Sequence, residues 1–114
     1  MTTVFGIKNC DTLKKALKWL DNQGINYQYH DYRKTGLDAE MLQTFVAELG
    51  WEPLINKRGT TYRQLSDEQK ASLDQPRAIA IMLDNPAIIK RPLLVHKGNY
   101  YLGFKESQYA EIFA

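Results

Sequence analysis

The chain has 114 residues, a formal net charge of +2 and one cysteine, so it suits a single domain and cannot close an internal disulfide. Hydrophobic residues make up 44% and charged residues 25%, the composition of an ordinary globular protein. No apolar run approaches the ~20 residues that span a bilayer, no leader peptide is visible, and the charge is too small to indicate nucleic acid. We therefore expect a cytoplasmic protein with no membrane and no direct nucleic-acid partner.

The first third of the chain has the pattern of a strand, a helix and a second strand. Residues 2–7 are rich in strand-forming types. Asp11 or Thr12 can cap a helix whose apolar residues recur at helical spacing to about Gln23. Residues 25–32 then predict a second strand. A connection this short implies a parallel pair with a right-handed crossover.

The middle of the chain shows helical patterns. Apolar residues over 41–49 predict one helix, and a capping box at Ser66 predicts a short second one. Pro76 can open a third helix, which Asn85-Pro86 should end. Because this stretch has no strand pattern, we interpret residues from about 35 to 86 as a helical insertion packed on the sheet.

The last third predicts a hairpin and a closing helix. Residues 93–96 and 100–103 read as two strands joined by a tight turn, and residues 106–113 read as a helix. The order is therefore βαβ, a helical insertion and ββα. We expect one α/β domain over residues 1–114 with a mixed four-stranded sheet.

Cys10 stands between the first strand and the first helix. Backbone N–H groups and the helix dipole favour negative charge there, and the thiolate is the nucleophilic form of cysteine. Lys8 and Lys14 add positive charge nearby, whereas Asp11 opposes them. The alternative is a cysteine that serves as a small buried hydrophobic residue. Because position 13 is Leu, there is no Cys-x-x-Cys pair, and a resolving thiol must come from outside.

Basic residues elsewhere are candidates for an anion site. Arg91 precedes Pro92, which opens a strand; an X-Pro bond there can be cis, and arginine offers a planar fork to an oxyanion or carboxylate. Lys57 and Arg58 lie on an expected exposed loop over 57–61. The alternatives are a trans proline on an edge strand, a surface arginine and a solvated loop. Without a Cys/His cluster at zinc spacing, we expect no metal.

Two histidines, His30 and His96, are candidate bases for a thiol, but nothing in the sequence brings them to Cys10. Structural histidines are the alternative. The tyrosines at 27–32 and 100–101 predict sheet faces packed on helices, with an aromatic partner surface as the alternative.

Three ordered segments then stand out. They are Gly6 to Thr12, Leu54 to Arg63, and a late segment containing Asn85-Pro86, Ile89 to Val95 and Gly103-Phe104. With these segments, essentially the whole chain resembles the ArsC/Spx family of arsenate reductase-like proteins, and within it the small bacterial proteins called YffB. The resemblance implies a thioredoxin-like fold with a helical insertion, a reactive Cys10, and a cis Pro92 beside it.

In the arsenate reductases of that family, a cysteine thiolate attacks arsenate, glutathione resolves the adduct, glutaredoxin recycles the thiol, and arginines bind the oxyanion. Arg91 matches the arginine before the cis proline. Asn56 and Phe104 stand at the other arginine positions, and Gly6 stands where one branch has a histidine. The Spx branch binds the RNA polymerase alpha subunit and senses redox state through a Cys-x-x-Cys pair. Leu13 stands at the position of the second cysteine of that pair.

Residues and resemblance together predict a glutathione-dependent thiol or oxyanion reductase that uses Cys10 as its nucleophile. Glutathione is the expected co-substrate, glutaredoxin a further candidate partner, and no tightly bound cofactor is expected. The predicted substrate- and glutathione-binding residues are Lys8, Asn9, Asp11, Thr12, Asn56, Lys57, Arg58, Arg91 and Pro92. The alternatives are a non-enzymatic Spx-like regulator that binds the RNA polymerase alpha subunit, and a family member that keeps the fold without activity.

Overall fold

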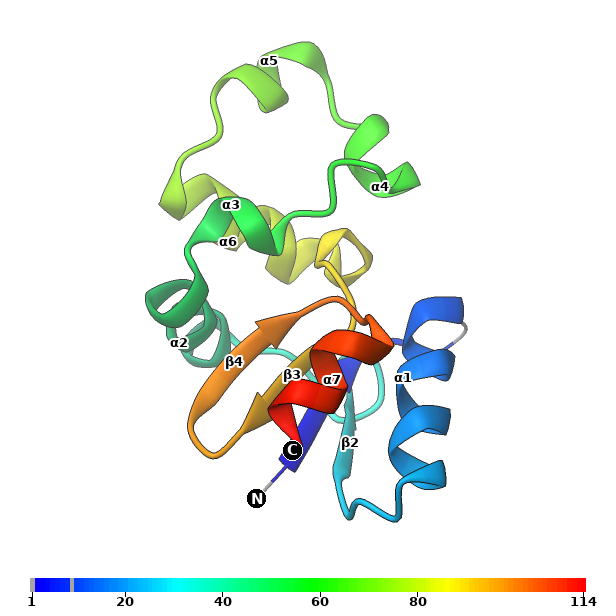
Figure 1. Ribbon diagram of the computed structural model, residues 1–114. Helices are drawn as coiled ribbons and strands as arrows, with labels where there is room; N and C mark the ends of the chain where they lie inside the picture. Colours follow the sequence, from blue (N-terminus) through cyan, green and yellow to red (C-terminus); the bar gives the residue numbers. More distant parts are fainter. Residues whose placement is uncertain (1, 9) are drawn as a thin grey trace. The chain divides into compact units, whose positions relative to one another are not determined.

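The computed structural model describes residues 2–8 and 10–114, and the chain divides into two compact units. Unit 1 comprises residues 1–35 and 91–114, and unit 2 comprises residues 36–90 (Figure 1). The insertion expected over about 35–86 corresponds to most of unit 2. Its packing on the sheet and the assignment of one domain to residues 1–114 stay predictions.

Unit 1 contains a mixed four-stranded sheet, as the sequence predicts. The strands are β1 (Thr2–Gly6), β2 (Gln28–Asp31), β3 (Leu93–His96) and β4 (Asn99–Leu102). Their order is β2-β1-β3-β4; β1 runs parallel to β2 and antiparallel to β3, and β3 runs antiparallel to β4. The parallel pair predicted for the first third is confirmed, and so is the hairpin.

Strand β2 is shorter than the predicted range of 25–32. Gly24 has a φ of +68°, and the N–H of Ile25 donates to the carbonyl of Leu20 at 3.0 Å. The chain is therefore still completing the end of the preceding helix at residue 25, and sheet pairing starts only at Gln28.

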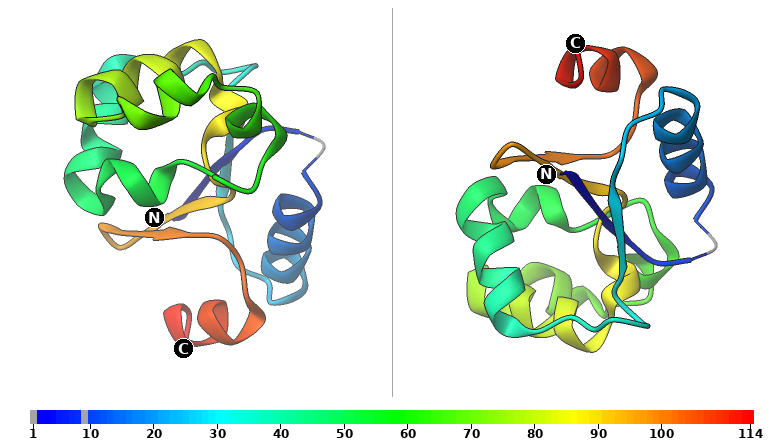
Figure 2. Two further views of the ribbon diagram at one scale, coloured as in Figure 1. Left: turned by 90° about the horizontal axis from the view of Figure 1, so that it is seen from above. Right: turned by 90° about the horizontal axis from the view of Figure 1, so that it is seen from below.

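Two helices of unit 1, α1 (Asp11–Asn22) and α7 (Glu106–Ile112), lie on the same side of the sheet (Figure 2). Their shared core consists of buried residues from β1, α1, β3 and α7: Val4, Leu13, Ala16, Leu20, Leu94 and Tyr109. The capping prediction needs correction, because Cys10 is the N-cap of α1 and Asp11 already belongs to the helix. Neither Asp11 nor Thr12 is the cap.

Unit 2 consists of short helices. They are α2 (Ala39–Leu49), α3 (Trp51–Leu54), α4 (Thr60–Arg63), α5 (Asp67–Ala71), α6 (Gln75–Asp84) and the 3₁₀ helix η1 (Pro86–Ile88). The capping box at Ser66 is present, and Asp38 and Asp74 cap α2 and α6 through their side chains. The exposed loop predicted over 57–61 ends earlier, because Thr60 already begins α4.

Within unit 2, α2 contacts α3 and α6, and α6 contacts η1. A short backbone bridge then joins two distant segments of this unit. Ile55 pairs antiparallel with Ile89, the Asn56 N–H donates to the Ile88 carbonyl at 2.9 Å, and the Lys90 N–H donates to the Leu54 carbonyl at 2.7 Å. Over the described residues, no helix is both long enough and apolar enough to cross a membrane.

Candidate active site

Cys10 lies where the chain leaves β1 and enters α1. It has extended backbone angles, its carbonyl accepts from the Lys14 N–H at 3.0 Å, and its side chain forms no capping hydrogen bond. The thiol is free and half-buried, and it packs against the core of unit 1. As the N-cap residue, Cys10 therefore stands at the positive end of the α1 dipole, at the turn whose first backbone N–H groups have no partner within the helix.

Gly6 allows α1 to begin this close to β1. A Cβ at this position would lie 3.0 Å from Leu13 Cδ2, closer than side-chain carbons normally approach. Leu13 is itself buried in the core, so with a larger residue at position 6 the Leu13 side chain would have to shift by a few tenths of an ångström. The glycine thus leaves room for Leu13, in the first turn of α1, to pack against the end of β1.

Asp31 is a buried carboxylate beside this loop, with 5% of its surface exposed. Its oxygens accept from the backbone N–H groups of Arg33 (2.8 Å), Lys34 (3.4 Å) and Lys8 (3.4 Å), and from the Tyr29 hydroxyl (3.4 Å). Burial alone would raise the pKa of Asp31, but these hydrogen bonds outweigh it and hold the pKa below its ordinary value. The carboxylate therefore stays ionised and ties the loop before Cys10 to the end of β2.

Tyr29 interacts with several charged groups of unit 1. Its register partner in β1 is Val4, so it lies on the sheet face that carries α1. Burial, the charge of Asp31, the hydrogen bond to Asp31 and the Cys10 thiolate raise the pKa of Tyr29 to about 12, while Arg91 lowers it. Tyr29 is thus within electrostatic reach of both Cys10 and Arg91, and 37% of its surface is exposed.

Arg91 and Pro92 occupy the turn into β3. Their peptide bond is cis, so the cis Pro92 implied by the resemblance is confirmed. Pro92 is buried, and its carbonyl accepts from the Gly103 N–H at 2.9 Å. Arg91 is half-buried. It lowers the pKa of Tyr32, which burial raises more strongly, and the Tyr32 hydroxyl is buried without a hydrogen-bond partner among the described residues.

The remaining predicted residues of unit 1 surround Cys10 in sequence. Lys8 is exposed in the loop, and Asp11 and Thr12 are exposed in the first turn of α1. Asn9, also predicted as a binding residue, lies outside the described residues. The structure therefore places Lys8, Asp11 and Thr12 next to Cys10 along the chain, and their role in binding stays a prediction.

Neither histidine lies at the end of β1 that leads to Cys10 on the face of α1. His30 pairs with Phe5, on the sheet face opposite Val4, and its ring lies 5.0 Å from that of Phe5. His96 pairs with Thr2 at the start of β1, whereas Cys10 follows the end of β1. His96 Nδ1 lies 2.8 Å from Thr2 Oγ1, and burial followed by the charge of Lys97 lowers the pKa of His96.

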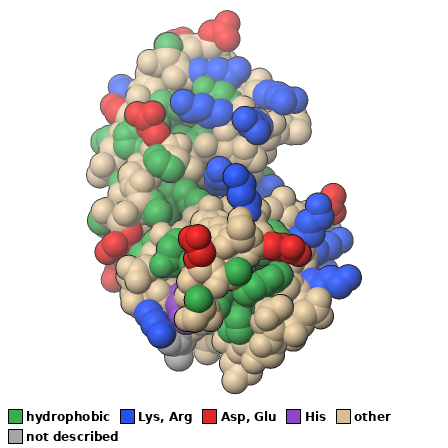
Figure 3. Space-filling model, viewed as in Figure 1, with side chains coloured by type: hydrophobic (Ala, Val, Ile, Leu, Met, Phe, Trp, Pro, Cys, Tyr) green, Lys and Arg blue, Asp and Glu red, His purple; other side chains and the backbone are tan. Residues whose placement is uncertain are grey.

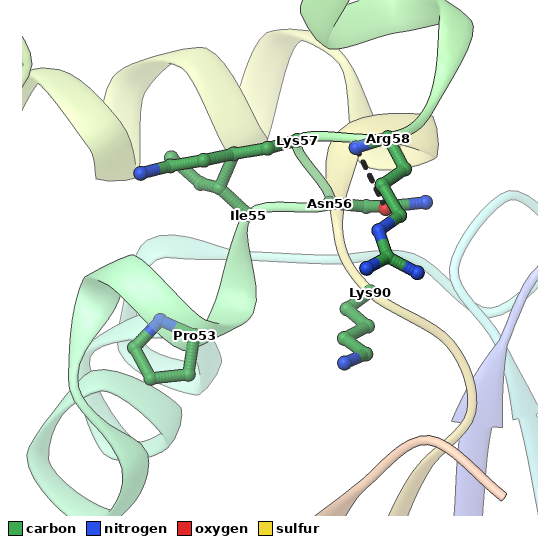
Figure 4. A pocket seen from close by; sticks show the side chains of 6 residues that line it. All are labelled: Pro53, Ile55, Asn56, Lys57, Arg58 and Lys90. Carbon is green, nitrogen blue, oxygen red and sulfur yellow. Dashed lines mark hydrogen bonds between the residues drawn. The ribbon is translucent and has the colours of Figure 1, made fainter.

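Three more of the predicted residues lie in unit 2, where Asn56, Lys57 and Arg58 line one pocket with Pro53, Ile55 and Lys90 (Figure 4). The pocket has a volume of about 410 Å³. The Asn56 side chain accepts from the Arg58 N–H at 3.2 Å, which orders this turn. Figure 4 shows the Arg58 side chain extending on the side of Lys90, while Lys57 extends the other way.

These features give the unit 2 pocket a positive lining. Lys57, Arg58 and Lys90 are cationic, and none forms an ion pair with an acidic side chain in the part of the chain that the structure describes. Asn56 adds a side-chain amide. Such a lining suits an anion, with the Arg58 fork suited to a carboxylate or an oxyanion. Lys90 was not predicted, because only the bridge between Ile55 and Ile89 brings it to this turn.

Asp31 and Tyr29 were also missed as site residues. A usable signal existed for Asp31, since an aspartate at a strand end commonly accepts from the N–H two residues on. Among the described residues, no group of three or more His, Cys, Asp or Glu side chains gathers as metal ligands would.

Residues 5–112 match the model of the ArsC family. The chain belongs to the ArsC family. It is 47% identical over 114 residues to an uncharacterized protein of Haemophilus influenzae, with both chains fully covered. The solved structure of a YffB protein has a TM-score of 0.93 at 46% identity, with full coverage of both chains. That of an arsenate reductase (ArsC) related protein from Brucella melitensis has a TM-score of 0.83 at 46% identity, covering 98% of this chain and 93% of that one.

More distant relatives include the global transcriptional regulator Spx of Streptococcus pyogenes. It is 25% identical over 111 residues, which cover 95% of this chain and 81% of Spx. A glutaredoxin from Archaeoglobus fulgidus is 14% identical with a TM-score of 0.50, and this likeness concerns the fold alone. Together with the sheet order, these matches confirm the thioredoxin-like α/β fold predicted from the resemblance.

Proposed function

We propose that this ArsC-family protein is a cytoplasmic, glutathione-dependent thiol reductase in which Cys10 is the nucleophile. The observation that carries the proposal is the setting of Cys10, a half-buried free thiol at the start of α1 in a chain without a second cysteine. Because one thiol cannot resolve its own mixed disulfide within the chain, the second thiol must come from outside. The relatives described as arsenate reductase or related to it support this reaction class.

The reaction exchanges one disulfide for another. The Cys10 thiolate attacks the glutathione sulfur of a mixed disulfide, the substrate leaves as a thiolate that takes up a proton, and a Cys10–glutathione disulfide forms. A second glutathione thiolate attacks the glutathione sulfur of that disulfide, releases Cys10 and forms oxidised glutathione. The substrate sulfur is released as a thiol, and the one glutathione thiol consumed ends in oxidised glutathione together with the glutathione that the substrate carried. Glutaredoxin can take the place of the second glutathione as the attacking thiol.

The proposed roles follow from charge and position. The N–H groups of the first turn of α1 stabilise the Cys10 thiolate. Arg91 and Cys10 are both within electrostatic reach of Tyr29. Arg91 supplies the positive charge for an anionic group of the substrate. Lys8, Asn9, Asp11, Thr12 and Pro92 complete the proposed binding residues of unit 1.

The proposed binding residues of unit 2 are Asn56, Lys57 and Arg58, and their pocket with Lys90 supports binding of an anionic group. Glutathione carries two carboxylates, which makes it a ligand of suitable charge. An oxyanion such as arsenate is the second substrate class, because relatives described as arsenate reductases share this family. In that case the Cys10 thiolate displaces water from protonated arsenate, and a glutathione thiol then attacks the adduct. Arsenite, water and a Cys10–glutathione disulfide result, because the two thiols supply the two electrons, and a second glutathione thiol releases Cys10 as oxidised glutathione forms.

The test measures NADPH oxidation in a coupled assay with glutathione reductase and a glutathionylated peptide as substrate. We expect Cys10→Ser to abolish turnover, and Arg91→Gln to lower kcat/KM about tenfold while Arg91→Lys keeps part of it. Mass spectrometry of the wild-type protein should show a single glutathione adduct on Cys10. Full turnover by Cys10→Ser would end the proposal, whatever the effect at Arg91.

A second candidate function is a non-enzymatic regulator that binds the RNA polymerase alpha subunit, favoured by the 25% identity to Spx over nearly the whole chain. Leu13 replaces the second cysteine of the Spx switch, so such binding would not depend on an internal disulfide. Titration of purified alpha subunit with the wild-type protein and Cys10→Ser distinguishes the two functions. Equal, saturable binding by both proteins supports the regulator, and the absence of binding rejects it.

A further inference from the structure

Unit 1 contains a depression that none of the residues assigned to thiol chemistry lines. It lies between α1 and the start of α7, has a volume of about 240 Å³, and is lined by Lys15, Lys18, Trp19, Asn22, Phe104 and Glu106. Cys10 does not line it. We propose that this groove docks an acidic segment of a partner protein, which inserts one large apolar side chain between Trp19 and Phe104.

The floor of the groove is aromatic and held from beneath. Trp19 and Phe104 are both half-buried. Each packs edge-on against the fully buried Tyr109, with ring centroids 5.7 Å and 4.7 Å away and interplanar angles of 85° and 88°. Because Tyr109 belongs to the core, the two rings form a fixed apolar surface. Well-packed aromatic pockets of this kind are where partners place an anchoring side chain.

The rim of the groove is positively charged along α1. Lys15 and Lys18 are exposed, one helical turn apart, and neither pairs with an acidic side chain among the described residues. Glu106 is the acidic residue of the lining. Figure 3 shows hydrophobic side chains gathered over α7, with Lys and Arg side chains on the side of α1. Two cations against one anion favour an acidic partner.

The spacing of the rim residues favours an extended peptide segment. Lys15, Lys18 and Asn22 fall at i, i+3 and i+7 on one face of α1. With a rise of 1.5 Å per residue, they span roughly 10 Å, which about three residues of extended chain cover at roughly 3.3 Å each. Lys15 and Lys18 themselves lie only ~4.5 Å apart along the axis. One acidic side chain of a short segment can therefore lie near both lysines while an apolar side chain enters the aromatic floor.

The test uses synthetic peptides as probes in ¹⁵N NMR of the full chain. The acidic probe is acetyl-Glu-Glu-Phe-Glu-Glu-amide; replacing Phe by Ala removes the anchor, and replacing Glu by Lys reverses the charge. The readouts are the indole N–H signal of Trp19, distinguished from Trp51 with the variant Trp51→Phe, and the amide signals of α1. We expect a saturable shift with the acidic Phe peptide, and at least tenfold weaker binding of the Ala and Lys peptides.

Matched substitutions locate the site. Lys15→Glu and Lys18→Glu should each weaken binding about tenfold, whereas Lys14→Glu, on the same helix but outside the lining, should weaken it less than threefold. All three side chains are exposed, so the variants should fold normally. Absence of a saturable shift at Trp19, equal binding of the Lys peptide, or an equal loss with Lys14→Glu would each overturn the docking site. Cys10→Ser should bind like the wild type, which separates this result from that of the reductase assay.

Discussion

The backbone N–H of Lys8 donates to Oδ2 of Asp31, 3.4 Å away, and so joins the loop before Cys10 to the end of β2. The same carboxylate accepts from Arg33 and Lys34, just after β2. Strands β1 and β2 are parallel, with Gly6 opposite Asp31, so both chain segments leave the sheet at the carboxyl ends of the two strands. One buried side chain therefore holds the two segments that frame Cys10.

Replacing this carboxylate should destabilise the protein. In Asp31→Asn, the new amide NH₂ group faces backbone N–H donors, and the charge-assisted hydrogen bonds to the carboxylate are lost. We therefore expect the free energy of unfolding to fall by about 1–3 kcal/mol. Urea denaturation at pH 7 measures it. The matched control is Asp21→Asn, whose exposed carboxylate accepts from the Tyr27 hydroxyl at 3.0 Å and should cost no more than about 0.5 kcal/mol. Equal losses in the two variants would contradict the role of Asp31.

The same residue should shape stability in acid. The pKa of Asp31 is lowered in the folded protein, because its hydrogen bonds outweigh the effect of burial. Its contribution is therefore fully present above the ordinary carboxyl range near pH ~4 and is lost as pH falls through the lowered pKa. Between pH 5 and pH 3, the wild type should lose more unfolding free energy than Asp31→Asn. Parallel pH profiles of the two proteins would count against this expectation.

Removing one buried hydroxyl should not weaken the core of unit 1. Tyr109 is fully buried, and its hydroxyl has no hydrogen-bond partner among the described residues. An unsatisfied buried hydroxyl costs about 1–3 kcal/mol, so Tyr109→Phe should keep the ring contacts and raise the free energy of unfolding by about 1 kcal/mol. Thermal denaturation measures the change. Tyr109→Leu, which loses the contacts with Trp19 and Phe104, should lower stability; a loss with Phe as well would point to a hidden partner for the hydroxyl.

The pocket of unit 2 should bind simple dianions through its cations. A ligand that binds only the folded protein raises its melting temperature, so we expect phosphate to raise the melting temperature of this protein. The comparison uses chloride at the same ionic strength. Arg58→Gln and Lys90→Gln should each weaken phosphate binding about 3–10-fold and reduce this rise. Lys34→Gln removes an exposed cation of unit 1 and should leave the rise unchanged. If Lys34→Gln reduced the effect as much, general screening would explain it.

Much of the fold was predictable because it depends on local signals. The spacing of apolar residues located α1 and α2, and the Ser66 capping box located α5. The turn at Lys97-Gly98 located the hairpin, because Gly98 accepts positive φ. Together, these signals determine most of the order of elements. The cis Arg91-Pro92 bond came from the family resemblance, because local sequence alone leaves both isomers open.

The missed site residues depend on pairing between distant segments. Asp31 matters because the register of β1 and β2 sets it beside the loop of Lys8, and Lys90 matters because a backbone bridge sets it beside Asn56. Tyr29 was assigned to sheet packing, and only its position near both Cys10 and Arg91 marks it as part of the site. Such relations are three-dimensional, and no local pattern in the sequence encodes them. The reactivity of Cys10 and the roles of the binding residues stay predictions.

The bridge between Ile55 and Ile89 has a consequence for how unit 2 can change in length. It closes the base of the excursion that contains α4, α5 and α6, and it fixes Asn56 and Lys90 at that base. Doubling the length of a closed flexible loop costs only ~0.6 kcal/mol of chain entropy. Residues can therefore be gained or lost between α4 and α5 while the turn of Asn56, Lys57 and Arg58 keeps its geometry. Evolution can lengthen or shorten this excursion and still inherit the same anion pocket.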